Sequence, residues 1–268
     1  MLGRTASSLF WMARYMERAE NIARLTQVGH RISITPDTGG GYREDWKTTL
    51  VSTGCLEAFQ AQHGKLNADA VRRFLIFDRE DPSSIRTCLE TARNNGRAVR
   101  TALTRQMWET LNATWNEFAA IDPASVDSGR VAELLDWVRE RSAQFRGATI
   151  GSLLRDEGFH FGQFGTFIER ADNTARILDV KYSVLLPANE AIGGERNLHR
   201  WETILRSVAA HSAYRHFYRD RYHLHRRRPY AGHSGPLCHR VPAGGRRYQR
   251  RGDRRCGGAD TGGAPWGG

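Results

Sequence analysis

The octapeptide Glu-Arg-Ala-Glu-Asn-Ile-Ala-Arg, residues 17–24, returns as Glu-Arg-Ala-Asp-Asn-Thr-Ala-Arg at residues 169–176. A second repeated pattern follows each copy: Trp-x-x-x-Leu-x-Ser occurs at residues 46–52 and again at residues 201–207. Internal repetition at a long interval indicates that one structural unit occurs twice in the chain. The sequence therefore predicts two related halves, each opening with the same helix.

Both copies have the residue spacing of an amphipathic helix with a core-facing apolar side. In the first copy, the apolar side consists of Met12, Tyr15, Met16, Ala19, Ile22, Ala23 and Thr26. In the second copy, it consists of Phe164, Phe167, Ile168, Ala171, Ala175 and Leu178. We therefore expect both helices to bury these sides in the protein core.

The charged residues of the two copies also agree in type. The candidate site residues are Arg14, Glu17, Arg18, Glu20, Asn21, Arg24, Glu169, Arg170, Asp172, Asn173 and Arg176. Each copy places an acid and an arginine at i,i+4, a spacing that supports a helix through an ion pair. Two interpretations are open: a solvated charged face, whose ion pairs contribute little, or a partly buried network of carboxylates and guanidiniums shared by the halves. The agreement between the copies favours the network.

Four of these residues are carboxylates on two helices (Glu17, Glu20, Glu169 and Asp172), as in helical metal sites. Di-iron bundles also require Glu-x-x-His, and neither copy has a histidine at that position. His160 precedes the second copy, and we expect it to be structural. The sequence contains no glycine-rich phosphate loop, nucleophile elbow or Cys/His set. We therefore assign no metal, no cofactor and no catalytic residue.

The composition sets wider limits. A chain of 268 residues, 40% of them hydrophobic, can bury the core of one large or two small domains. No run approaches the roughly 20 apolar residues that span a membrane. The four cysteines show neither a CxxC pair nor metal-ligand spacing, which predicts a reduced, cytoplasmic protein.

The pattern along the chain is helical, and no alternating strand pattern of useful length occurs. We expect helices at about residues 1–35, 43–63, 68–78, 82–120, 131–154, 158–186 and 198–221. The helix over 82–120 has a weak point at Asn95-Gly96. The predicted fold is an all-α helical bundle built from two related halves, with an irregular basic C-terminal tail. The expected divisions are residues 1–121 for the first half, 122–222 for an apparently truncated second half, and 223–268 for the tail.

The tail holds ten arginines and two acidic residues, and so accounts for most of the formal net charge of +11. Three interpretations are open: a disordered basic extension, a nucleic-acid-binding arm, or out-of-frame translation of GC-rich DNA from about residues 220–226. The repeat favours the last interpretation, because the expected counterpart of residues 71–82 is replaced by Arg-Arg-Arg-Pro-Tyr near residue 226.

Residues 1–24 resemble the start of the bacterial alpha-E domain family, whose hallmark is a helical domain with a repeated Glu-Arg motif. Residues 74–78 and 165–182 are similar to later signatures of the family, and the likeness covers residues 1–222. On this resemblance, Glu17-Arg18 and Glu169-Arg170 are the motif positions.

Members of that family tend to be encoded beside an ATP-grasp ligase-like protein and a transglutaminase-like protein. The resemblance therefore implies a non-catalytic helical partner or scaffold in a bacterial peptide-synthesis or peptide-modification system. One alternative is an enzyme that uses the paired carboxylates as general acid and base. The other is nucleic-acid binding through the arginine-rich tail, which we do not expect because the signal lies in the tail alone.

Overall fold

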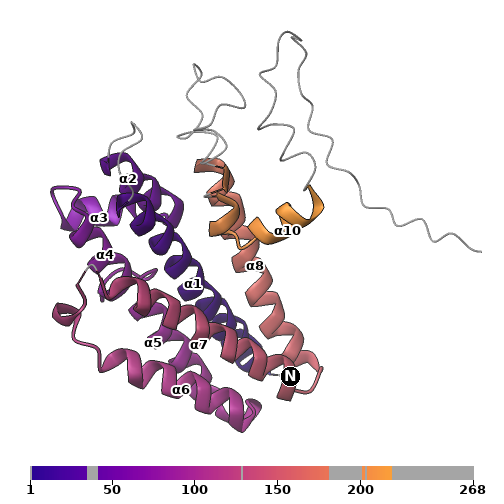
Figure 1. Ribbon diagram of the computed structural model, residues 1–268. Coiled ribbons are helices and arrows are strands. Elements are labelled where there is room, and N and C mark those ends of the chain that lie inside the picture. Colours follow the sequence, from indigo (N-terminus) through magenta and orange to yellow (C-terminus); the bar gives the residue numbers. More distant parts are fainter. Residues whose placement is uncertain (1, 35–41, 128, 181–200, 203, 219–268) are drawn as a thin grey trace, which may run out of the picture. The chain divides into compact units, whose positions relative to one another are not determined.

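The computed structural model of the chain is built of helices joined by short turns in its described part (Figure 1). The structure describes residues 2–34, 42–127, 129–180, 201–202 and 204–218. No strand occurs within these ranges, so the all-α prediction is confirmed. None of the helices in these ranges is both long and apolar enough to cross a membrane.

The chain divides into two units, Met1–Arg227 and Arg228–Gly268, and every described residue belongs to the first. The predicted tail, residues 223–268, lies outside the described residues. The expected boundary between halves at residues 121 and 122 stays a prediction.

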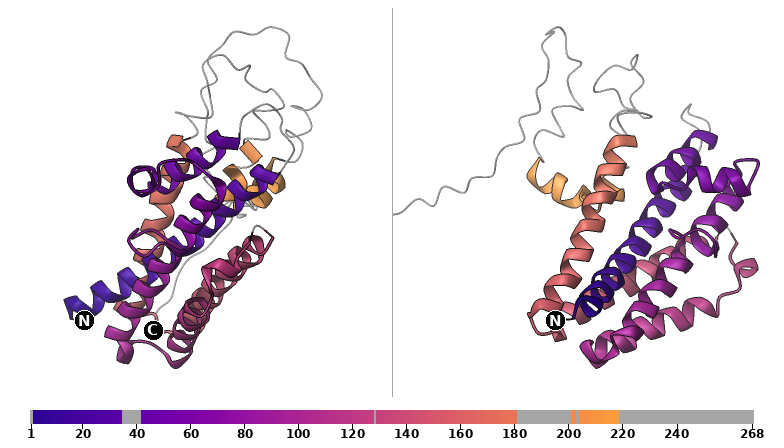
Figure 2. Two further views of the ribbon diagram at one scale, coloured as in Figure 1. Left: turned by 90° about the vertical axis from the view of Figure 1, so that its left-hand side faces the viewer. Right: turned by 180° about the vertical axis from the view of Figure 1, so that it is seen from behind.

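The first helix, α1 (Gly3–Ile34), is the central element of the described bundle and packs against α2, α4, α5, α7 and α8 (Figures 1 and 2). Its predicted apolar side is buried: Met12, Met16, Ala19, Ile22 and Ala23 belong to the main hydrophobic core. Because other helices cover its remaining sides, α1 also buries much of its charged side. This burial requires each charge to have a partner, since an isolated buried charge is very costly.

The predicted helix over residues 43–63 is two helices, α2 (Tyr42–Thr53) and α3 (Leu56–Gln62). The break lies at Gly54, whose φ of 73° is in the left-handed region that favours glycine. The N–H of Gly54 donates to the Val51 carbonyl and the N–H of Cys55 to the Leu50 carbonyl, which ends α2 in a Schellman-type turn.

Side-chain caps define the next two helices. Asn67 accepts a hydrogen bond from the N–H of Asp69 at the start of α4 (Ala68–Phe77). The fully buried Ser84 accepts one from the N–H of Thr87 at the start of α5 (Ile85–Ala98). Such caps satisfy N–H groups that have no partner within the helix.

The prediction of one helix over residues 82–120 was wrong. After α5, the short 3-10 turn Arg100–Ala102 reverses the chain into α6 (Arg105–Ala119), which Thr104 caps. Gly96 is buried where α5 packs on α6. A Cβ at this position would stand 2.5 Å from a methyl group of Leu111. The glycine therefore allows close packing of α5 on α6 and does not break the helix.

The last two long helices are α7 (Val131–Ser152) and α8 (Glu157–Val180). The prediction that α8 buries its apolar side was wrong, because Phe164, Phe167 and Leu178 are 57%, 59% and 40% exposed. The charged side of α8 faces α1 and is the side that packs. The cause is the set of ion pairs across this helix pair, described below.

The predicted helix over residues 198–221 is interrupted at Ala209, whose φ is 56°. Helical residues 204–207 precede the break, and α10 (His211–Phe217) follows it. Ile204 packs with Leu25 of α1 and Ile177 of α8 in a small second core. Residues 181–186, 198–200, 203 and 219–221 of the predicted helices lie outside the described part of the chain.

Candidate functional site: a buried network of glutamates and arginines

The charged network is built on α1 and α8, which run side by side in the same direction (Figure 2). Early residues of α1 pack against early residues of α8, and late residues against late ones: Phe10 lies against Phe164, and Leu25 packs with Ile177. The two backbones lie very close at Gly165, where a Cβ would stand 2.2 Å from the carbonyl oxygen of Phe10. This close approach places the two Glu-Arg motifs opposite each other.

Glu17 is held by arginines from two other helices. Arg170 of α8 donates from Nε to Oε1 at 2.6 Å and from Nη2 to Oε2 at 3.2 Å. Arg146 of α7 donates from Nη1 to Oε2 at 3.1 Å. The two-point contact with Arg170 is the geometry in which a guanidinium binds a carboxylate most strongly. Glu17 therefore ties α1 to both α7 and α8.

Glu169 makes the reciprocal arrangement. Arg18 donates from Nε to Oε1 at 2.7 Å and from Nη2 to Oε2 at 3.0 Å, while Arg14 donates from Nε to Oε2 at 2.7 Å. Glu17-Arg18 and Glu169-Arg170 thus pair crosswise, each glutamate with the arginine of the other motif. Glu17, Glu20 and Glu169 are 5%, 3% and 4% exposed, while the side chains of their arginine partners remain partly exposed. The network is therefore partly buried and is no fully solvated face.

Glu20 is the third buried acid of the network. It accepts a hydrogen bond from Arg24 one turn later on α1, and Arg146 donates to its Oε2 at 2.9 Å. Burial by itself raises the pKa of Glu20, but the hydrogen bonds and charges of Arg146 and Arg24 outweigh it and lower the pKa below its ordinary value. Arg146 bridges Glu17 and Glu20, so one guanidinium from α7 serves two carboxylates of α1.

This lowered pKa predicts that part of the stability is lost in acid. Ionised Glu20 stabilises the fold above the ordinary glutamate pKa, and that contribution disappears as the pH falls through the lower folded-state pKa. We expect Glu20→Gln to lose less stability than the parent between pH 7 and pH 3, measured by urea unfolding. Glu109→Gln, which removes an exposed acid paired with Arg105, should retain the parent's pH dependence. A parent-like pH dependence in Glu20→Gln would contradict the prediction.

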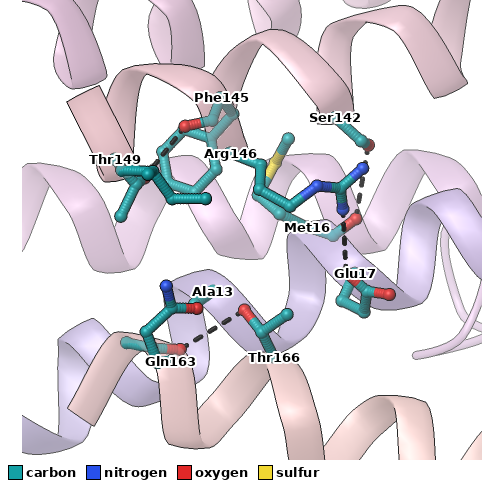
Figure 3. A pocket seen from close by; sticks show the side chains of 11 residues that line it. Ala13, Met16, Glu17, Ser142, Phe145, Arg146, Thr149, Gln163 and Thr166 are labelled. Carbon is teal, nitrogen blue, oxygen red and sulfur yellow. Dashed lines mark hydrogen bonds and ion pairs between the residues drawn. The ribbon is translucent and has the colours of Figure 1, made fainter. Parts of the chain in front are cut away.

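A cavity of about 30 Å³ lies beside Glu17, between α1, α7 and α8 (Figure 3). Arg146 reaches across it to Glu17, and the Ser142 hydroxyl donates to the carbonyl of Met16 at 3.4 Å. This volume has room for one or two water molecules. It is too small for a substrate to reach the Glu17 carboxylate.

A larger cavity of about 120 Å³ lies on the opposite side of α1, between α1, the end of α2 and α8. Six of the predicted site residues line it: Arg18, Asn21, Glu169, Asp172, Asn173 and Arg176. Asp172 and Arg176 form the expected i,i+4 ion pair at 3.0 Å, and both are partly exposed at the rim. The charged network therefore adjoins both cavities, and this one is the larger of the two.

The structure brings the predicted site residues together and adds two that the sequence analysis missed, Arg146 and Ser142. Both lie on α7, on the side that carries the buried residues Val138 and Phe145. The sequence could have indicated both residues, because a polar side chain within the apolar stripe of a buried helix face needs a hydrogen-bond partner.

The two cysteines in the described part of the chain are poorly suited to catalysis. Burial, together with the nearby Asp81, raises the pKa of Cys55 to about 12, and burial also raises the pKa of Cys88. Thiols are nucleophilic as thiolates, so both are inert near neutral pH. His160 is exposed at the start of α8, next to Phe159. No cluster of metal-ligand residues occurs in the described part of the chain.

Comparison with known protein families shows the family of this chain. Residues 1–227 match the model of the Alpha-E family, described as a predicted alpha-helical domain with a conserved ER motif. The chain belongs to the Alpha-E family. Searches of curated proteins and of solved structures find no match. In this Alpha-E protein, the crossed pairs give the Glu-Arg motif a physical role: each motif joins one long helix to the other.

Proposed function

We propose that this Alpha-E protein is a non-catalytic helical partner or scaffold in a bacterial peptide-synthesis or peptide-modification system linked to an ATP-grasp ligase-like protein. The observation that carries the proposal is the crossed pairing of the motifs. Every oxygen of Glu17 and Glu169 already accepts a guanidinium hydrogen bond. Three guanidinium hydrogen bonds turn each of these carboxylates toward its arginines, whereas a general base must face the proton of a substrate. These glutamates are therefore better suited to joining helices than to proton transfer.

The proposal includes the origin of the two helices as related halves of a duplicated unit. The crossed pairs support it, since Glu17 corresponds to Glu169 and Arg18 to Arg170 in the repeat. Leu25 and Ile177 correspond in the same way and pack together. We also place the protein in the cytoplasm, in keeping with the free thiols of Cys55 and Cys88. A transglutaminase-like protein is the second proposed member of the system.

The proposed docking surface is the apolar stripe of α8. Its members are spaced alternately three and four residues apart, as in helices that pack on another helix: Phe161, Phe164, Ile168, Ala171, Ala175 and Leu178. Most of these side chains are exposed. Exposed apolar patches of this kind mark interaction sites.

The occupant that we propose is an amphipathic helix of the ligase-like protein. Its chemistry follows from α1, where the repeat places Leu9, Met12, Met16 and Ala19 at the corresponding positions, all of them buried. The α1 stripe packs with α5, whose own stripe contains Ile85, Cys88, Leu89 and Ala92. A partner helix with a similar stripe of aliphatic and small residues would cover α8 in the same manner.

Co-purification with an ATP-grasp ligase-like protein tests this proposal. We expect Ala171→Glu to weaken the complex at least about tenfold, because it places a charge in the middle of the apolar contact. Ala171 is exposed, so the melting temperature of the isolated protein should not change. Phe217→Asp alters an equally apolar exposed residue outside the stripe and should bind like the parent.

Two results would contradict the proposal. One is the absence of any complex between the parent protein and the ligase-like protein. The other is a complex in which Ala171→Glu and Phe217→Asp bind equally well, because the α8 stripe would then not be the docking surface.

A further inference from the structure

The larger cavity contains a buried amide whose donor has no partner. Asn21 of α1 is 7% exposed and lines the cavity, yet its Nδ2 donates to no acceptor in the described part of the chain. Leaving a buried donor unpaired costs about 1–3 kcal/mol. A buried polar group with this cost calls for an explanation, and a bound ligand that supplies the missing acceptor would provide one.

The cavity wall offers further donors. Arg18 uses Nε and Nη2 for Glu169, and Arg176 uses Nε for Asp172. A guanidinium has five N–H donors, so both arginines keep donors beyond these bonds. Gly54 lies against Arg176, since a Cβ there would stand 2.7 Å from Nη1. The glycine leaves room for the guanidinium at the cavity edge.

The same wall also attracts a cation. Asp172 accepts its ion pair with Arg176 through Oδ2, and a carboxylate can accept several hydrogen bonds. Ser52 and Thr53, which also line the cavity, belong to the last turn of α2. The carbonyl end of a helix carries partial negative charge and favours a cation. Positive and negative groups are thus present together: Arg18 and Arg176 with Glu169, Asp172 and the end of α2.

We propose that this cavity binds a small zwitterion, a free α-amino acid. Its carboxylate binds the Asn21 amide and the remaining donors of Arg18 and Arg176, while its ammonium group binds Asp172 and the end of α2. The volume of about 120 Å³ suits one small amino acid and is too small for a nucleotide. The inference does not depend on the proposed partner, because every residue that it uses belongs to this chain.

Isothermal titration calorimetry on the full chain tests the proposal with glycine, L-alanine and L-serine. Acetate, methylamine and inorganic phosphate serve as probes that carry only one kind of charge. We expect at least one amino acid to bind about tenfold more tightly than acetate or methylamine, because each charged end adds a hydrogen-bonded contact. Equal binding of acetate and amino acids, or tighter binding of phosphate, would make this an anion site and overturn the proposal. So would the absence of binding.

Asn21→Leu separates binding from folding. Leucine has a similar size and removes an unpaired buried donor, so the melting temperature should stay at or above that of the parent. Amino-acid affinity should fall about tenfold. Thr174→Ala, at an exposed site on α8 outside the cavity lining, should retain both properties. An Asn21→Leu protein with parental affinity would overturn the assignment, whatever the result of the co-purification experiment.

Discussion

Replacing Glu169 with glutamine should lower the free energy of unfolding by about 3 kcal/mol and the melting temperature by roughly 10 °C. Glu169 is buried and accepts three guanidinium hydrogen bonds from Arg14 and Arg18. Glutamine keeps the shape of the side chain, but one oxygen becomes an NH₂ group that faces other donors. Two guanidiniums then lose their counter-charge. We place the cost at the low end for a broken buried pair because both arginines are about one-fifth exposed.

Thermal and urea unfolding of matched variants measures this effect. Glu117→Gln removes the acid of an exposed ion pair between α6 and α7, formed with Arg141, and should cost less than about 1 kcal/mol. In a double-mutant cycle, Arg18→Leu and Glu169→Leu should show a coupling energy of about 2 kcal/mol. Equal stability of Glu169→Gln and Glu117→Gln would mean that the buried network does not hold the helices together.

Helix boundaries were predictable where local chemistry sets them. Proline at position 123 follows the end of α6, and a 3-10 turn begins there. The break at Gly54 was missed because a glycine within a helical pattern is ambiguous. The same residue type allows close packing at Gly96 and a left-handed turn at Gly54. Only the tertiary neighbours distinguish the two uses.

The buried side of α8 could not be read from its pattern. Periodicity identifies two sides of a helix, and the usual inference is that the apolar side is the buried one. Here the glutamates and arginines of α1 and α8 satisfy each other across the helix pair, so the charged side can be buried without unpaired charge. The apolar side of α8, with Phe164 and Phe167, is then left exposed.

The sequence identified which residues form the candidate site, but it did not show which glutamate pairs with which arginine. Repetition of residue types in both copies identified the charged residues, and the i,i+4 pairs Glu20–Arg24 and Asp172–Arg176 followed from helix geometry. The crossed pairs join residues more than 150 positions apart, and Arg146 comes from a helix outside the repeat. One sequence contains no signal for such contacts, because they depend on how α7 and α8 pack on α1.

Gly165→Ala should have the other large effect. In an ordinary helix interior this change stabilises by about 1 kcal/mol. At this position, however, the new Cβ would stand 2.2 Å from the carbonyl oxygen of Phe10 and 3.3 Å from the backbone nitrogen of Arg14. Backbone atoms cannot rotate away as a side chain does, so α8 must move off α1. We expect a net loss of about 3 kcal/mol, from overpacking and from weakened crossed ion pairs.

Gly162→Ala is the matched control, one turn earlier in α8, where a Cβ would meet nothing within 4 Å. It should stabilise the protein by about 0.5–1 kcal/mol through helix propensity alone. The two glycines therefore predict effects of opposite sign from the same substitution in the same helix, measured by urea unfolding. A stabilising Gly165→Ala would mean that α1 and α8 are not in close contact at this point. The crossed Glu-Arg pairs would then lose their geometric basis, because they require that approach.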